Sequence, residues 1–160
     1  MEQERHKVRP ATVQLTTSGT IVSIQLCPGH RKPMVMVDEV EAVVALGLKG
    51  DRHALQDSSR QILLIESETL EAFGLTPGQV KENITTAGIS LRTLARKQRL
   101  KIGADVVVEL TGECAPCFRM DEIRSGLKSE LDGKRGMLAR IIQGGKIRTG
   151  DPIDVITNPS

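Results

Sequence analysis

The sequence predicts a mainly β protein, a β-barrel with a few short helices inserted into it. Short runs rich in Val and Ile recur along the whole chain between Gly, Pro, Asn and Asp, and they outnumber helical patterns roughly three to one. No period of about 20–50 residues repeats, which argues against a solenoid or a propeller. Because helices do not alternate regularly with strands, a closed or nearly closed barrel is favoured over βαβ units.

The first half of the chain contributes four predicted strands and one helix. The strands cover residues 20–26, 33–37, 40–46 and 61–65. The dipeptide Pro28-Gly29 ends the first strand, and the continuous apolar run of the fourth is typical of a buried strand. Ser67 is placed to cap a helix that Gly74 ends.

The second half adds further strands and a second helix. The predicted elements are a strand-like piece at 81–88, a short basic helix at 91–100, a strand at 100–110, a helix at about 120–131, and strands at 137–142 and 147–156. The helix at 120–131 places four apolar side chains on one face: Met120, Ile123, Leu127 and Leu131.

Length and composition indicate one domain with an aliphatic core. The 160 residues show no composition break, so we predict one domain at residues 19–157 after a flexible leader at 1–18. With no Trp, no Tyr and only two Phe, the core must be built from aliphatic side chains, and no aromatic platform exists for nucleic-acid bases. The net charge of +2, from 22 basic and 20 acidic residues, also argues against a nucleic-acid partner.

The remaining composition signals concern the compartment. Three cysteines are an odd number in a chain of this length, which is unlike a disulfide framework and suits a reducing compartment. No apolar run has the length of a signal peptide or of a membrane span. We therefore expect a cytoplasmic protein without a membrane partner.

The pair Cys114 and Cys117 is the first candidate for chemistry. It follows a strand and precedes a predicted helix, so a thiolate at Cys117 would gain from the helix dipole and from Arg119. The same two small residues could instead simply line a turn. A thioredoxin-like pair would require a βαβ context, and a structural zinc site would require four ligands, whereas the three histidines are scattered.

Three further segments could surround an anionic ligand. The loop Asp51-Arg52-His53 follows a glycine and offers amides, a guanidinium and an imidazole, although alone it is more typical of a solvated surface turn. Asn83 could present hydrogen-bonding groups to a pocket, or lie on an ordinary edge strand. Arg135, in a basic turn, and Arg140, on the strand after it, are the remaining basic candidates.

Taken together, these segments resemble the MOSC family, named for the C-terminal domain of molybdenum cofactor sulfurase. The matching stretches follow the family's order and lie at residues 47–53, 60–64, 82–84, 100–103, 116–117 and 144–151. The resemblance covers about residues 19–157, nearly the whole chain. It implies a distorted β-barrel whose cleft holds a molybdenum-pterin cofactor.

The resemblance also implies roles for individual residues. Cys117 corresponds to the family cysteine, which is a metal ligand in reductase members and is thought to carry a persulfide in sulfurase-type members. The loop at 51–53 and Asn83 correspond to segments that approach the pterin or its phosphate. Arg135 and Arg140 would assist this binding, and Cys114 receives no role beyond modulating its neighbour.

Short stand-alone members of the family resemble bacterial reductases of N-hydroxylated compounds, which makes such a reductase the leading expectation. The 160 residues show no iron–sulfur cysteine pattern, and we expect neither the N-terminal β-barrel of some reductase members nor the pyridoxal-phosphate domain of full sulfurases. Electrons would therefore come from a separate donor protein. A link to pyridoxal phosphate would rest on the family association alone. Two alternatives remain: a sulfur carrier loaded by a cysteine desulfurase, and a cofactor-binding module without turnover.

Overall fold

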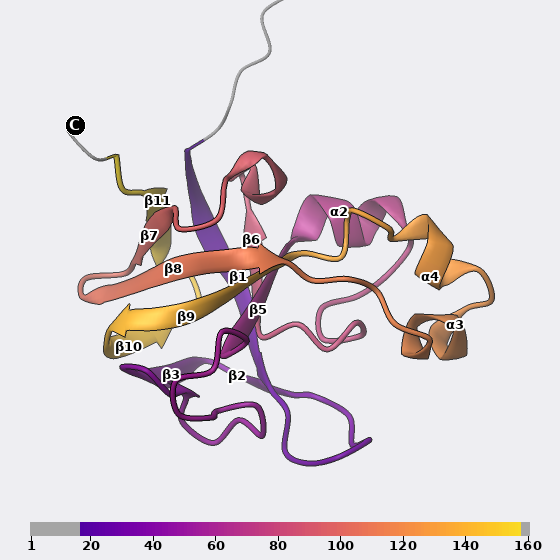
Figure 1. The fold of residues 1–160 in the computed structure, drawn as a ribbon, viewed down its shortest axis with the longest axis horizontal. Helices are drawn as coiled ribbons and strands as arrows, with labels where there is room; N and C mark the ends of the chain where they lie inside the picture. The colour runs from indigo at the N-terminus through magenta and orange to yellow at the C-terminus, as the bar shows by residue number, and fades with distance from the viewer. Residues whose placement is uncertain (1–16, 158–160) are drawn as a thin grey trace, which may run out of the picture.

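Pairing between the first and the last strand closes the larger sheet into a barrel (Figure 1). The computed structural model describes residues 17–157 of the chain. Around the barrel the strands are β11 (Pro152–Val155), β7 (Arg99–Ile102), β8 (Val106–Glu113), β9 (Met137–Gln143), β5 (Ile62–Glu66), β6 (Ile84–Ala87) and β1 (Ser18–Leu26). Among these pairs only β5 and β6 run parallel, and β1 returns to β11 through the register Ser18 to Asp154.

Four further strands lie outside this closed ring. They are β2 (Val35–Val37), β3 (Glu39–Val43), β4 (Gly47–Leu48) and β10 (Gly145–Arg148). Strand β2 pairs with the end of β1, whereas β10, β3 and β4 form a separate three-stranded sheet. Strand β4 leads directly into the loop that the sequence marks as a candidate binding segment.

The barrel interior is filled by aliphatic side chains, as the composition requires. In β3, β7 and the first part of β8, buried side chains alternate with more exposed ones, which is the period-two pattern of a strand with one face inside. Strand β5 is different because all five of its residues are buried. Ile62 and Leu64 face the barrel core, whereas Ile65 faces a second, smaller core outside it.

Three short helices cover that outer face of β5. They are α2 (Ser67–Ala72), α3 (Arg119–Ile123) and α4 (Leu127–Glu130), and Figure 1 shows them gathered at one side of the barrel. Their apolar side chains and those of the connecting loops form the second core: Ile65, Leu70, Leu75, Val80, Met120, Leu127 and Leu131. This core holds the segment between β8 and β9 against the barrel.

The predicted fold class is confirmed, and two helix predictions are wrong in detail. Residues 91–100 form only a short 3-10 turn (Leu91–Thr93) before β7 begins at Arg99. Leu91 and Leu94 pack on the barrel core, but the polar residues 96–99 supply no apolar side chain that would extend this face into a helix. The helix at 120–131 is split into α3 and α4, since Gly126 adopts a left-handed conformation with φ of 88°. The strand at 100–110 is a hairpin of β7 and β8 that turns at Gly103.

The expected leader at residues 1–18 lies largely outside the described residues. Its last two residues belong to the barrel, since Ser18 begins β1 and the Thr17 carbonyl accepts a 2.8 Å hydrogen bond from the Val155 amide. No helix among the described residues is long and apolar enough to cross a membrane.

Candidate functional site

The carboxylate of Asp51 organises the loop that follows β4. Its side chain is fully buried, with Oδ1 accepting hydrogen bonds from the Cys27 amide at 2.7 Å and from Asn83 Nδ2 at 3.2 Å. The second oxygen, Oδ2, accepts from the His53 amide at 3.1 Å. Asp51 therefore does not face a ligand; it fixes the loop so that Arg52 and His53 project outward.

Asn83 completes the same support from the neighbouring segment. It is 2% exposed and precedes β6. Its Oδ1 accepts from the Leu63 amide at 3.0 Å, and its Nδ2 also donates to the Gln25 carbonyl at 3.1 Å. One amide side chain thus joins β1, β5 and the loop at Asp51, while also lining the cavity described next.

An inner cavity of about 110 Å³ lies beside this support. Its polar lining comes from His53, Arg60, Lys81, Asn83, Cys114 and Arg135. Its apolar floor is formed by Ile62, Leu63 and Leu138. The cavity therefore combines one thiol with several cationic groups over an apolar base.

Arg135 is the most deeply placed cation of this cavity, with only 7% of its surface exposed. Its guanidinium donates to Cys114 Sγ at 2.8 Å, to the Val80 carbonyl at 2.6 Å and to Met120 Sδ at 3.3 Å. Among the residues that the structure describes, no carboxylate lies within ion-pair distance of it. A nearly buried cation without an anionic partner favours binding of an anion beside it.

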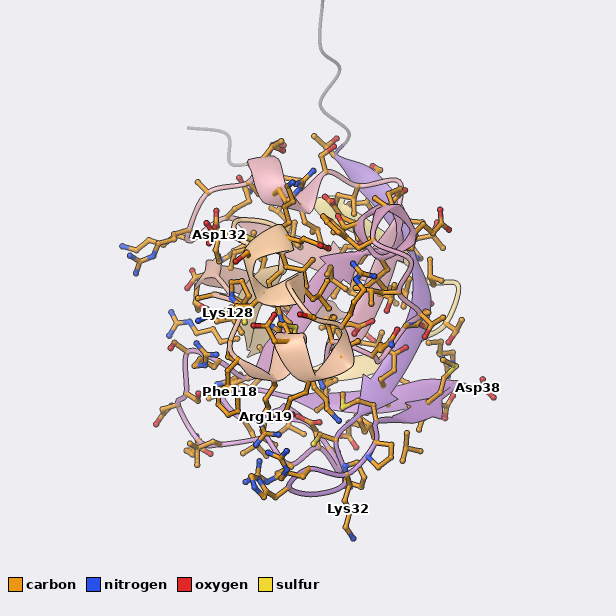
Figure 2. All side chains as sticks on the ribbon, turned by 90° about the vertical axis from the view of Figure 1, so that its right-hand side faces the viewer. Lys32, Asp38, Phe118, Arg119, Lys128 and Asp132 are labelled. Atoms are coloured by element: carbon orange, nitrogen blue, oxygen red, sulfur yellow. The ribbon has the colours of Figure 1, made fainter. Side chains whose placement is uncertain are left out.

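A wider outer hollow of about 280 Å³ continues from the inner cavity, sharing His53, Lys81 and Arg135 with it. The outer hollow adds Cys27, His30, Arg31, Lys32, Arg52 and Arg119. We call the two hollows together the basic cleft. Figure 2 shows two of its labelled cations, Lys32 and Arg119, on the face that also carries Phe118.

The charge of the basic cleft is strongly one-sided. Seven Lys and Arg side chains and two histidines line it, and no Asp or Glu does. The pKa of His30 is lowered, first by partial loss of solvent around its ring and then by the positive charges of Arg52, Arg119 and Arg31. Because the whole chain carries a net charge of only +2, this concentration of cations is a local feature suited to an anionic ligand.

The two remaining predicted site residues lie elsewhere. Cys117 is exposed in the irregular segment between β8 and α3, where its carbonyl accepts from the Met120 amide at 2.9 Å, and it is not among the residues that line the basic cleft. Arg140 projects from β9 and pairs with Glu109 at 2.7 Å. That pair and the bond from Arg99 hold the pKa of Glu109 below its usual value.

The structure also brings in residues that sequence reasoning did not select as binding groups: Arg31, Lys32, Arg60, Lys81, Arg119 and the thiol of Cys114. Apart from the neighbours Arg31 and Lys32, these residues come from separate segments and share no spacing pattern. The sequence pointed to Cys114 and Arg119 only as neighbours of Cys117, and to Arg60 and Lys81 only as the first residues of a family-like stretch and of a strand-like piece.

A buried acid, Glu82, stands in the sequence between two residues that line the cleft, Lys81 and Asn83. Glu82 is fully buried, and its Oε2 accepts from the Gly78 amide at 2.7 Å and from the Thr85 hydroxyl at 2.9 Å. Its other oxygen, Oε1, has no hydrogen-bond partner. Burial raises the pKa of Glu82, although these bonds and the charge of Arg135 oppose the rise.

The donor set fits an anionic cofactor that brings its own metal ligands. The cations can hold phosphate, and a soft thiol at Cys114 lies beside them in the inner cavity. Within residues 17–157, no group of three or more His, Cys, Asp or Glu side chains is arranged to hold a metal ion.

The fold and the cleft together define a β-barrel protein with a basic binding site, and the comparisons identify the family. The MOSC domain model matches residues 50–154, so the chain belongs to the MOSC domain family. This match spans the loop at Asp51, Asn83, both cysteines of the pair and Arg135. No curated protein sequence matches the chain.

Solved structures share this fold. YuaD from Bacillus subtilis superposes with a TM-score of 0.73 at 18% identity, over 86% of this chain and 95% of that one. YiiM from Geobacillus stearothermophilus gives 0.68 at 21% identity, over 87% and 75%. YiiM from Escherichia coli gives 0.65 at 17% identity, over 92% and 72%. At these identities the likeness concerns the fold alone.

Proposed function

We propose that the chain binds a molybdenum-pterin cofactor in the basic cleft and reduces N-hydroxylated compounds with electrons from a separate donor protein. One observation carries the proposal: seven cationic side chains line the cleft and no carboxylate does. A site of this kind favours a ligand with phosphate groups. Membership of the MOSC family supports the pterin cofactor as that ligand.

The two hollows suit different ends of such a ligand. The inner cavity of about 110 Å³ is smaller than the roughly 300 Å³ at which small-molecule pockets usually begin, so it admits one end only. The outer hollow presents Lys32, Arg52 and Arg119 to solvent and suits the anionic end. When bound, the cofactor supplies the redox-active metal; the chain supplies the charges that hold it and a thiol beside it.

Cys117 remains the metal ligand that the family resemblance predicts. Cys117 is exposed and does not line the basic cleft, so it would have to turn toward the cofactor, whereas Cys114 already lies in the inner cavity. Substituting each cysteine by alanine in turn distinguishes the contribution of Cys117 to activity from that of Cys114. We expect Cys117→Ala to abolish reduction of an amidoxime or hydroxylamine driven by a chemical electron donor.

Cofactor retention tests the binding step directly. The protein is produced in a host that makes the cofactor, and molybdenum and pterin are measured per chain. We expect Arg52→Ala to weaken retention about tenfold, since a charge-assisted hydrogen bond contributes about 1.5–3 kcal/mol. The matched control is Arg140→Ala, which removes an exposed arginine that pairs with Glu109 outside the cleft.

Two results would contradict this proposal. Wild-type retention in a variant lacking Lys32, Arg52 and Arg119 together would exclude the cleft as the binding site. Retention without any turnover would instead indicate a cofactor-binding module.

The exposure of Cys117 favours a second candidate function, a sulfur carrier. A persulfide accepted from a cysteine desulfurase requires a thiol that another protein can reach, and Cys117 is the exposed cysteine among the three. Mass spectrometry after incubation with a desulfurase and cysteine tests this role. Absence of a persulfide on Cys117, under conditions that load a known carrier, would exclude it.

A further inference from the structure

We propose that Cys117 and Cys114 form a two-step sulfur relay: Cys117 accepts a sulfane sulfur at the surface, and Cys114 receives it inside the basic cleft. The inference rests on the sulfur-carrier function and gives the second cysteine a role. It follows from the different surroundings of two thiols that are separated by only two residues.

Cys114 has the surroundings of a receiving site. It is 6% exposed, and it lines the inner cavity together with His53. Its Sγ lies 2.8 Å from Arg135 Nη1 and 3.9 Å from Arg60 Nη2. A persulfide anion formed there would lie against two guanidinium groups, which are strong donors to anions.

Cys117 has the surroundings of a loading site. It is exposed, and the neighbouring Phe118 is 62% exposed on the face seen in Figure 2. A donor protein can therefore reach Cys117, whereas the low exposure of Cys114 excludes direct contact with a protein-sized donor. Residues 114–117 belong to no helix or strand. The Cys114 amide donates to the Gly136 carbonyl at 2.9 Å and the Cys117 carbonyl accepts from the Met120 amide at 2.9 Å, so transfer requires rotation of the two thiols and movement of the residues between them.

Each step of the relay is a thiol exchange that balances without an added oxidant or reductant. In the first step, the Cys117 thiolate attacks the outer sulfur of a donor persulfide, R–S–SH; a new S–S bond forms at Cys117, and the donor leaves as R–S⁻. In the second, the Cys114 thiolate attacks the outer sulfur of Cys117–S–SH. The bond at Cys117 breaks, Cys117 leaves as thiolate, and Cys114 carries the persulfide.

Cys27 serves as an internal control for these exchanges. It is also buried and lines the outer hollow of the basic cleft, but its thiol donates to the Gly29 carbonyl at 3.3 Å and no cysteine lies near it in the sequence. The relay therefore predicts that sulfur from a protein donor reaches Cys114 and not Cys27, although both are buried.

The experiment compares a protein-sized donor, a persulfidated cysteine desulfurase, with a small one, inorganic polysulfide. Persulfides are trapped by alkylation at successive times and located by mass spectrometry. Cys114 and Cys117 share one tryptic peptide, residues 102–119, so fragment ions between them assign the label, while Cys27 lies in another peptide. The proteins are the wild-type chain, Cys117→Ser, Cys114→Ser and Arg135→Gln.

With the protein donor, we expect the label on wild-type Cys117 first and on Cys114 later. Cys117→Ser should slow the loading of Cys114 by more than about tenfold, whereas polysulfide should still load Cys114 in this variant, which also shows that the cavity is intact. In Cys114→Ser the label should stay on Cys117. In Arg135→Gln the share of label on Cys114 should fall about tenfold relative to Cys117, because a charge-assisted hydrogen bond is lost.

Two outcomes would overturn the relay alone. In one, the label never leaves Cys117 in the wild-type chain. In the other, the protein donor loads Cys114 as fast in Cys117→Ser as in the wild-type chain. If neither the desulfurase nor the polysulfide labels Cys117, the sulfur-carrier function is overturned as well. These results separate the failure of the relay from the failure of the function on which it rests.

Discussion

Removal of the Asp51 carboxylate should destabilise the fold and the basic cleft together. In Asp51→Ala the buried Cys27 amide loses its 2.7 Å acceptor, and Asn83 Nδ2 keeps only its bond to the Gln25 carbonyl. Each buried donor left without a partner costs about 1–3 kcal/mol, whereas the more exposed His53 amide can turn to water. With two buried donors affected, we therefore expect the free energy of unfolding to fall by about 2–6 kcal/mol.

Such a loss is large against the roughly 5–15 kcal/mol that stabilises a typical domain. It corresponds to a fall in Tm of about 10 °C, at roughly 2–4 °C per kcal/mol for a chain of this size. Urea unfolding followed by circular dichroism measures it, and the matched control is Asp51→Asn. The asparagine keeps one acceptor oxygen and the side-chain volume, so we expect it to cost only about 1–2 kcal/mol.

Two results would refute this reasoning. An Asp51→Ala protein within about 1 kcal/mol of wild type would mean that the buried donors find other partners on their own. Equal losses in Asp51→Ala and Asp51→Asn would mean that the negative charge, rather than the set of hydrogen bonds, stabilises the loop.

Three further predictions concern packing, a buried acid and a surface pair. Gly136→Ala should lower the free energy of unfolding in urea by more than about 3 kcal/mol, because its new Cβ would collide with the Leu64 carbonyl. The matched control is Gly133→Ala, which has φ of 76° but open space around it and should cost only about 1 kcal/mol. Equal losses in the two variants would contradict the collision. Burial raises the pKa of Glu82, so at pH values between the usual carboxyl pKa and the raised one the folded chain holds a proton that the unfolded chain releases. The free energy of unfolding should therefore decline as the pH rises through this range. Unfolding curves recorded at several pH values should lose this decline in Glu82→Gln, and a decline that persists in the variant would show that Glu82 is not its cause. Arg140→Ala should cost less than about 1 kcal/mol, since its pair with a carboxylate lies at the surface, and a larger loss in urea unfolding would contradict a merely superficial role.

Strand patterns predicted the barrel because each strand has its own local signal. Alternation in β7 and the continuous apolar run of β5 are both readable along the chain. The break in the helix predicted at 120–131 could not be read from its apolar pattern, because that pattern correctly describes which residues are buried. Met120, Leu127 and Leu131 all lie in the second core. The pattern of burial survives the break at Gly126, so periodicity alone could not reveal that the helix is split.

The candidate site was predictable only in part. Asp51 and Asn83 stand in segments with a recognisable order, and the structure joins them by a hydrogen bond of 3.2 Å. Lys81 and Arg119, by contrast, reach the cleft through loops, and a single sequence does not show which loops meet. Sequence reasoning gave the chemistry to Cys117 and only a modulating role to Cys114. It could not show that Cys114 is buried in the inner cavity and Cys117 exposed, because burial depends on how the loops pack.

The closure of the barrel through β1 and β11 has a consequence for folding on the ribosome. One edge of β1 is matched by β6; the other is matched by β2 at the end of the strand and by β11 at its beginning. Strand β11 is synthesised more than a hundred residues after β1, as the pairing of Gly19 with Ile153 shows. Until then the beginning of the nascent β1 lacks this partner and is open to pairing with other chains. Contacts of such long sequence separation also slow the final step. We therefore expect chains stalled before Pro152 to be held by chaperones or to aggregate, although most of the cleft-forming segments are already complete.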